Sequence, residues 1–200
     1  KCMVPVDNLP IIFYAFQKFP QAEFTIIADY KTDVLEKYLS AFASKYKYKV
    51  LQTSKKGTIA GIKEAVETYS DDEQVFIMWC DLILPDSFEI PKEKGNYIGI
   101  SKDFECRWSF KNGQFEKTAS KENGVAGLFI FENKKYLKNI TQEGALVGWL
   151  QNQNIKFNEL PLYGTKEVGT MLAYSELNAN PLKCRPFNKI QFDGDVIIKT

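Results

Sequence analysis

Strand-like and helix-like segments alternate along the first half of this 200-residue chain, and this alternation limits the possible folds most strongly. Apolar runs of strand length lie at residues 24–28, 48–51 and 75–79. Amphipathic helical patterns precede or separate them at residues 11–19, 32–44 and 59–69, with Thr32 as the expected N-cap of the second. Strands joined through helices imply a sheet covered on both faces. The pattern therefore predicts an α/β fold, Rossmann-like and three-layered (α/β/α), with a mostly parallel mixed sheet.

After Pro85 the pattern changes to shorter pieces with antiparallel features. Lys111-Asn112-Gly113 is a turn signal that predicts a hairpin between residues 107–110 and 114–117. Further strands are expected at residues 97–100, 125–131 and 155–160, and helices at residues 133–139 and 143–153. Residues 178–181 break the pattern, and residues 188–199 are typical of a second hairpin around Asp193-Gly194. We expect one domain over residues 1–178, followed by a linker and β-hairpin over residues 179–200.

Composition limits the possible chemistry of the chain more strongly than it limits the possible folds. The chain has 26 Lys+Arg, 25 Asp+Glu and no His, so every histidine-dependent nucleophile, base or zinc site is excluded. A net charge of +1 gives no general electrostatic attraction to nucleic acid or membranes, so we expect neither as a partner. The 4 cysteines form no CxxC pair. Without a signal peptide or membrane-length apolar run, we interpret them as free thiols in a cytoplasmic protein.

Three segments carry candidate chemistry, and each also has an ordinary structural explanation. Lys1 precedes an apolar segment, Val4-Pro5-Val6, and could be a solvated terminal lysine. Residues 52–58 form a polar loop between a strand and a helix, as in many α/β proteins. Asp81 follows a buried strand and could be a turn or capping residue. The loop and Asp81 nevertheless belong at the carboxyl edge of the predicted sheet, where α/β proteins bind their ligands.

Together these segments resemble the family of sugar-phosphate and phosphocholine-type nucleotidyltransferases. Lys1 to Val6 is similar to the second half of the family's G-x-G-x-R…Pro-Lys motif, whose glycine-rich loop would precede Lys1 and is not in this chain. Gln52 stands five residues before Gly57-Thr58, as the family's base-reading glutamine does before a Gly-Thr pair. Cys80-Asp81 takes the place of a Gly-Asp at a strand end. The resemblance covers about residues 1–178.

The second half adds two further matches. Glu116-Lys117 and the following strand with Gly127 are similar to the family's substrate-contacting segment, with Thr118 where the family has Pro. Glu167-Val168-Gly169-Thr170 is similar to its metal-binding Asp-x-Gly-Thr, with Glu in place of Asp. Residues 185–199 are similar to the first strands of a kinase-like phosphotransferase lobe, so residues 179–200 either begin such a fused domain or close the first one with a hairpin.

The resemblance implies a Mg²⁺-dependent enzyme that joins a nucleoside triphosphate to a small phosphorylated acceptor and releases pyrophosphate, for surface polysaccharide (capsule or lipopolysaccharide) or lipid synthesis. It implies catalytic roles for Lys1 and Lys117, and metal binding by Asp81 and Glu167. It also implies nucleotide binding by Gln52, Gly57 and Thr58, and acceptor binding by Glu116, Lys117 and Gly127. The alternative is a nucleotide-sugar-binding glycosyltransferase-like or non-catalytic relative of the same fold. Glycosyltransferases of this architecture usually carry Asp-x-Asp, whereas this chain has Asp81-Leu82-Ile83, which favours the enzyme of the first kind.

Overall fold

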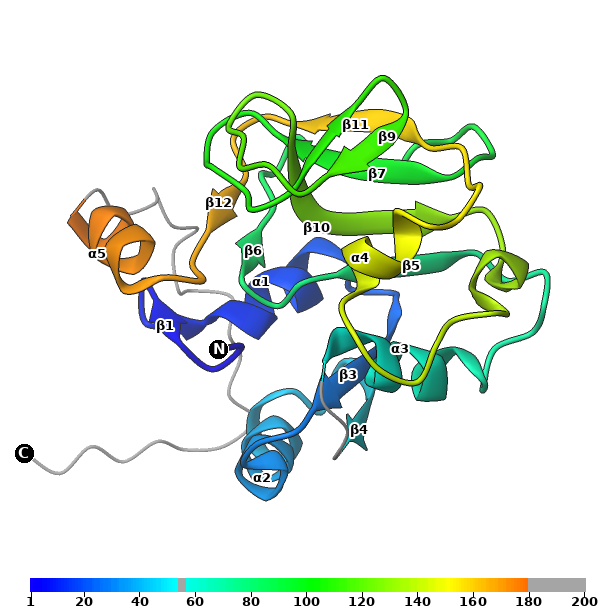
Figure 1. The fold of residues 1–200 in the computed structure, drawn as a ribbon. Helices are drawn as coiled ribbons and strands as arrows, with labels where there is room; N and C mark the ends of the chain where they lie inside the picture. Colours follow the sequence, from blue (N-terminus) through cyan, green and yellow to red (C-terminus); the bar gives the residue numbers. More distant parts are fainter. Residues whose placement is uncertain (54–56, 180–200) are drawn as a thin grey trace, which may run out of the picture.

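The computed structural model describes residues 1–53 and 57–179, and it confirms the alternation expected for the first half (Figure 1). The elements there are β1 (Pro5–Val6), β2 (Leu9–Pro10), α1 (Ile11–Lys18), β3 (Glu23–Ala28), α2 (Thr32–Phe42), β4 (Lys47–Gln52), α3 (Thr58–Val66) and β5 (Val75–Met78). The later elements are β6 (Leu82–Ile83), β7 (Tyr97–Ser101), β8 (Ser109–Lys111), β9 (Gln114–Glu116), β10 (Gly124–Phe131), η1 (Lys134–Leu137), α4 (Leu146–Leu150), β11 (Asn158–Leu162), β12 (Lys166–Glu167) and α5 (Met171–Ala179).

The sheet is mixed, as expected, and β10 lies at its centre. All eight residues of β10 are buried, and the strand pairs antiparallel with both β5 and β7. β11 pairs parallel with β7, and β8 also pairs antiparallel with β10, so β5, β7, β8 and β11 share one direction. β10 runs against them together with β9, which pairs antiparallel with β8. The individual pairings around β10 are therefore antiparallel, unlike those of a mostly parallel sheet. A parallel neighbour needs a crossover connection, usually a helix, and the described chain between β7 and β10 contains no helix.

Helices cover both faces of the strands in three layers. α1 and α2 pack on one face of the parallel β3–β4 pair, where Phe16 and Leu39 are completely buried. α3 lies on the opposite face, and Tyr69 just beyond it shares a hydrogen bond of 2.7 Å with Thr25 of β3. α3 and α4 also cover one face of the β5–β10–β7 strands, so the predicted α/β/α arrangement is confirmed.

Several local predictions need correction. Thr32 does not cap α2, because Lys31 occupies the N-cap position with a left-handed backbone (φ 51°) and Thr32 is already helical. The helix expected at residues 133–139 is the short 3₁₀ helix η1, and the one expected at residues 143–153 is limited to α4. α4 cannot begin earlier because Gly144 has a φ of +120°. α5 ends at Ala179, the last residue described, and the predicted boundary at residue 178 stays a prediction.

The remaining sequence predictions concern the tail and the membrane. The predicted hairpin at residues 188–199 and the kinase-like domain lie outside the described residues. Within the described part of the chain, no helix combines the length and the apolar character needed to cross a bilayer. Cys2, Cys80 and Cys106 are free thiols, and Cys184 is outside the described residues.

Candidate active site

Asp81 lies three residues after the end of β5 and directly before β6, and the structure brings Lys1 to it. The Lys1 Nζ atom donates to Asp81 Oδ2 at 3.1 Å, although eighty residues separate the two in the chain. The Asp81 side chain is only 11% exposed, whereas that of Lys1 is 58% exposed. Asp81 thus holds Lys1 in place, and the Lys1 side chain faces solvent beside this nearly buried carboxylate.

Glu167 reaches the same place from the other end of the chain. β12 pairs antiparallel with β6, which sets Glu167 opposite Leu82 and next to Asp81. Gly169 N–H donates to Glu167 Oε1 at 2.7 Å. A methyl group on Gly169 would overlap that oxygen and would lie 2.8 Å from Asp81 Oδ2. The two carboxylates therefore converge over Gly169.

The electrostatics of this pair fit a bound cation. Burial raises the pKa of Glu167 and the Asp81 charge raises it further, while the Gly169 N–H and Lys1 act in the opposite direction. Asp81 Oδ1 is buried and has no hydrogen-bond partner. Within the residues described, no third acidic or thiol group joins the two carboxylates. Two carboxylates and an unsatisfied oxygen suit Mg²⁺, which keeps several waters and substrate phosphates among its ligands.

The predicted nucleotide-binding residues surround the start of α3. Gln52 ends β4 and is exposed, and residues 54–56 of its loop are not described. Gly57 has a φ of +92°, and any side chain there would overlap the carbonyl oxygen of Gly144. The Thr58 hydroxyl accepts a hydrogen bond of 3.2 Å from Leu146 N–H at the start of α4. Gly57 and Thr58 thus join α3 to α4 in this structure, a packing role that the sequence did not indicate.

The predicted acceptor residues lie apart from the carboxylates. Glu116 ends β9 and Lys117 follows it, and both are exposed on the β8–β9 hairpin. No hydrogen bond or ion pair in the described structure joins either residue to Lys1, Asp81 or Glu167. Their expected roles remain predictions that need a bound acceptor to test them.

Trp79 is a residue near this site that sequence reasoning missed. The indole packs directly on Gly127, its backbone N–H donates to Gly127 O at 2.9 Å, and the residue is still 36% exposed. We interpreted it only as the end of an apolar strand. The signal was a tryptophan two residues before the candidate metal ligand Asp81, at the edge where ligands bind.

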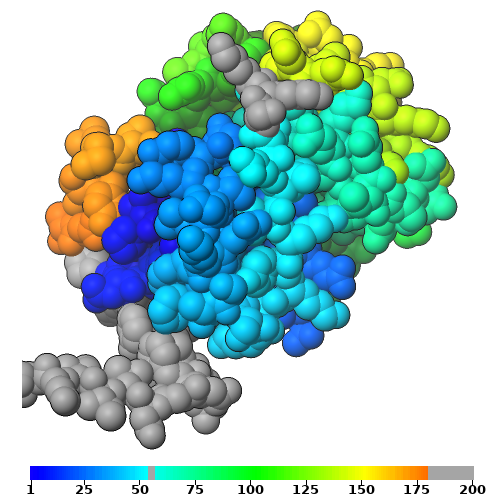
Figure 2. Space-filling view, turned by 90° about the horizontal axis from the view of Figure 1, so that it is seen from below, coloured from blue at the N-terminus to red at the C-terminus, as the bar shows by residue number. Residues whose placement is uncertain are grey.

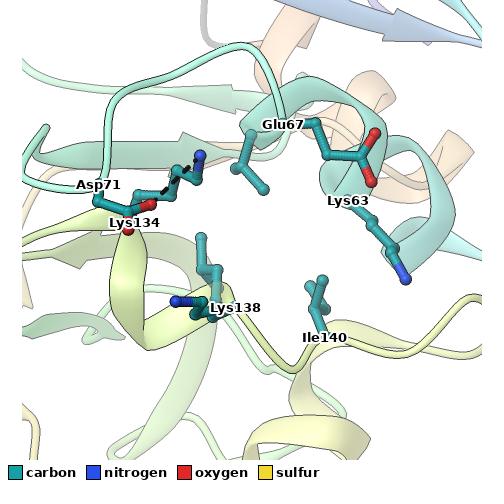
Figure 3. Close-up of a pocket in the computed structure, with 8 residues that line it drawn as sticks. Lys63, Glu67, Asp71, Lys134, Lys138 and Ile140 are labelled. Atoms are coloured by element: carbon teal, nitrogen blue, oxygen red, sulfur yellow. Dashed lines mark ion pairs between the residues drawn. The ribbon is translucent and has the colours of Figure 1, made fainter.

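One hollow on the described surface adjoins the residues beside the carboxylates, and another lies apart from them. A cavity of about 190 Å³ lies between α3 and η1, lined by Lys63, Lys134 and Lys138 around an apolar floor (Figure 3). Lys134 there is held by Asp71 at 3.5 Å, and none of the predicted site residues lines this cavity. A groove of about 360 Å³ runs from Lys1 to Tyr174 past Gly169, where α5 lies against the N-terminal segment (Figure 2).

Comparison with solved structures shows which proteins share this fold. No protein-family model and no curated protein matches the sequence. The inositol-1-phosphate CTP transferase from T. maritima aligns with a TM-score of 0.66 at 16% identity, over 90% of this chain and 86% of that one. The CTP:phosphocholine cytidylyltransferase from Streptococcus pneumoniae aligns with a TM-score of 0.68 at 11% identity, over 90% of this chain and 88% of that one. The nucleoside-diphosphate-sugar pyrophosphorylase from Vibrio cholerae RC9 aligns with a TM-score of 0.63 at 16% identity, over 90% of this chain and 91% of that one.

Proposed function

We propose that this protein, whose chain has the fold of the nucleotidyltransferases above, is itself a Mg²⁺-dependent nucleotidyltransferase. It joins a nucleoside triphosphate to a phosphorylated sugar or small headgroup such as phosphocholine and releases pyrophosphate. The observation that carries the proposal is the meeting of Lys1, Asp81 and Glu167 at the end of β5, with Asp81 Oδ1 buried and unsatisfied. Buried carboxylate oxygens in folded proteins usually have a partner, and a bound cation would supply one for Asp81 Oδ1.

The reaction suits a chain that has no histidine. An oxygen of the acceptor phosphate attacks the α-phosphorus, the bond from that phosphorus to the bridging oxygen breaks, and pyrophosphate leaves with the electron pair. The attacking oxygen is already ionised, so no general base has to remove a proton. The protein must position two anions and neutralise their charge, which lysines and a bound cation can do.

Each predicted residue then has a defined task. Asp81 and Glu167 would hold Mg²⁺, which when bound neutralises charge on the phosphate oxygens. Lys1, exposed beside them, would bind the triphosphate. Gln52 would read the base through its amide. Lys117 would bind the acceptor phosphate and Glu116 would orient its organic part.

A product analysis tests the proposal. The purified protein is incubated with Mg²⁺, one of CTP, UTP or dTTP, and either phosphocholine or a sugar 1-phosphate, and products are identified by mass spectrometry. We expect one nucleotide-linked product together with pyrophosphate, and neither without a divalent cation. If no combination of triphosphate and acceptor gives a product but the protein binds a nucleotide sugar, it is instead a non-catalytic or glycosyltransferase-like relative of the same fold.

Three finer expectations stay predictions at this stage. These are a role in surface polysaccharide or lipid synthesis, a cytoplasmic location, and a kinase-like domain beginning within residues 179–200.

A further inference from the structure

Trp79 extends one face of the central sheet beyond the end of β5. Side chains alternate along a strand, and Val75 and Ile77 of β5 pack into the core beneath α3 and α4. Trp79 continues this series, and its ring centroid lies 6.5 Å from that of Phe129 in the same core. The indole therefore stands at the open end of this core, two residues before Asp81.

The neighbouring strand is shaped to seat the indole. Between Val125 and Phe129, β10 advances four residues while β7 advances only two, which is a β-bulge. Gly127 lies in the bulge with a φ of +80°, and a side chain there would overlap the indole atoms Cγ, Cδ2 and Cε3. Only glycine combines this conformation with so close a contact. The bulge fixes one face of the ring on the backbone.

Part of Trp79 remains open to solvent. The residue is 36% exposed although Phe129 beside it is completely buried. Because Gly127 covers one face of the ring, a ligand could contact only the opposite face or the edge. A rigidly seated indole with an exposed π face attracts positively polarised C–H groups, above all the methyl groups of a quaternary ammonium or the apolar face of a sugar ring.

We propose that Trp79 is the stacking surface for the organic group of the phosphorylated acceptor, with that group carrying either N-methyl or sugar C–H hydrogens. The inference rests on the proposed function, which supplies an acceptor bound near Asp81. It reassigns Gly127, expected to contact the substrate, as the residue that supports Trp79. The indole gives affinity and selectivity for the organic group, while other residues bind the phosphate.

Binding measurements test the inference without relying on turnover. Phosphocholine, a sugar 1-phosphate and inorganic phosphate are each titrated into wild-type protein with Mg²⁺, followed by tryptophan fluorescence and calorimetry. We expect one of the two organic phosphates to change the fluorescence and to bind more tightly than inorganic phosphate. Which one does so identifies the acceptor as an ammonium or a sugar.

Variants assign the signal to Trp79. Trp79→Leu should weaken binding of that organic phosphate about 3- to 30-fold and leave inorganic phosphate binding unchanged. Trp79→Phe keeps an aromatic ring, so it should lose the fluorescence change but retain most of the affinity. Trp108→Phe is the matched control, because Trp108 is partly buried against the same core, and it should retain both.

The outcomes separate this inference from the proposed function. It is overturned if neither organic phosphate changes the fluorescence, if the change survives in Trp79→Phe, or if Trp79→Leu and Trp79→Phe both bind the organic phosphate as wild type does. If wild-type protein catalyses nucleotidyl transfer and Trp79→Leu has the same KM for the acceptor, the proposed function stands and only the role of Trp79 is refuted. Conversely, a Trp79-dependent affinity without transfer from any triphosphate would refute the function and leave the binding surface.

Discussion

At the residue scale, Asp81 has an environment that folding alone does not explain. Its side chain is 11% exposed, shares its site with Glu167, and has one oxygen bonded to Lys1 and the other unsatisfied. Two adjacent carboxylates repel each other, and an unsatisfied buried oxygen destabilises the folded state. A group with these properties is expected where a bound cation is needed.

The first prediction therefore concerns Asp81→Asn. Removing one negative charge relieves the repulsion with Glu167 and loses only a half-exposed ion pair with Lys1, so the melting temperature should change little. Loss of metal binding should lower kcat about 100-fold or more. Thermal unfolding and steady-state kinetics measure the two effects. Asp72→Asn is the control, because it removes a carboxylate paired with Lys135 on the surface. Near wild-type activity of Asp81→Asn would contradict the assignment of Asp81 as a metal ligand.

The second prediction concerns Gly127→Ala, with Gly113→Ala as a matched control. Both glycines have similar positive φ values, +80° and +78°, so the backbone penalty of about 1–2 kcal/mol is shared. Only Gly127 also faces the indole, because nothing lies within 4 Å of the position a Gly113 side chain would take. Denaturant unfolding should show a clearly larger loss for Gly127→Ala, by about 1 kcal/mol or more. Equal losses would mean that the indole is not fixed on Gly127.

At the element scale, α1 is held to the β3–β4 pair by aromatic packing. Phe16 is completely buried, and its ring centroid lies 4.8 Å from both the stacked Tyr46 ring and the edge-on Phe24 ring. These residues come from α1, from β3 and from the turn that directly precedes β4. The cluster therefore fixes the segment after Lys1 relative to the strands that lead to Gln52.

The third prediction tests this cluster with Phe16→Ala. Removing a fully buried phenylalanine should lower the free energy of unfolding by about 3–5 kcal/mol. Phe42→Ala in α2 is the control: Phe42 is 51% exposed, and its loss should stay within about 1 kcal/mol. Chemical denaturation measures both. A small effect for Phe16→Ala would show that α1 is not held by this packing.

Most elements could be predicted because their signals are local. The apolar runs that became β3, β4, β5 and β10 differ from the observed strands by only a residue or two at either end. Helix ends were predicted less well, since Thr32 was favoured as a cap by residue type, whereas Lys31 adopted the left-handed conformation instead. Antiparallel features were expected after Pro85, but the pairing of β10 with both β5 and β7 could not be predicted, because strand pairing depends on residues distant in sequence.

At the scale of the whole molecule, the site depends on contacts between the two ends of the described chain. The order of motifs was enough to predict that Lys1, Asp81 and Glu167 share a site, and the structure brings all three together. Sequence could not show that Gly57 faces Gly144 or that Trp79 occupies the space over Gly127. Each of those contacts joins separate elements whose spacing only the folded chain defines.

In the proposed reaction an acceptor phosphate oxygen attacks the nucleoside triphosphate, and isotope labelling can follow that oxygen into the product. The acceptor is prepared with ¹⁸O in its three non-bridging phosphate oxygens and incubated with protein, Mg²⁺ and the preferred triphosphate. Mass spectrometry of the products should find all three labels in the nucleotide-linked product and none in pyrophosphate. Label in pyrophosphate, or no nucleotide-linked product from any triphosphate, would contradict the account.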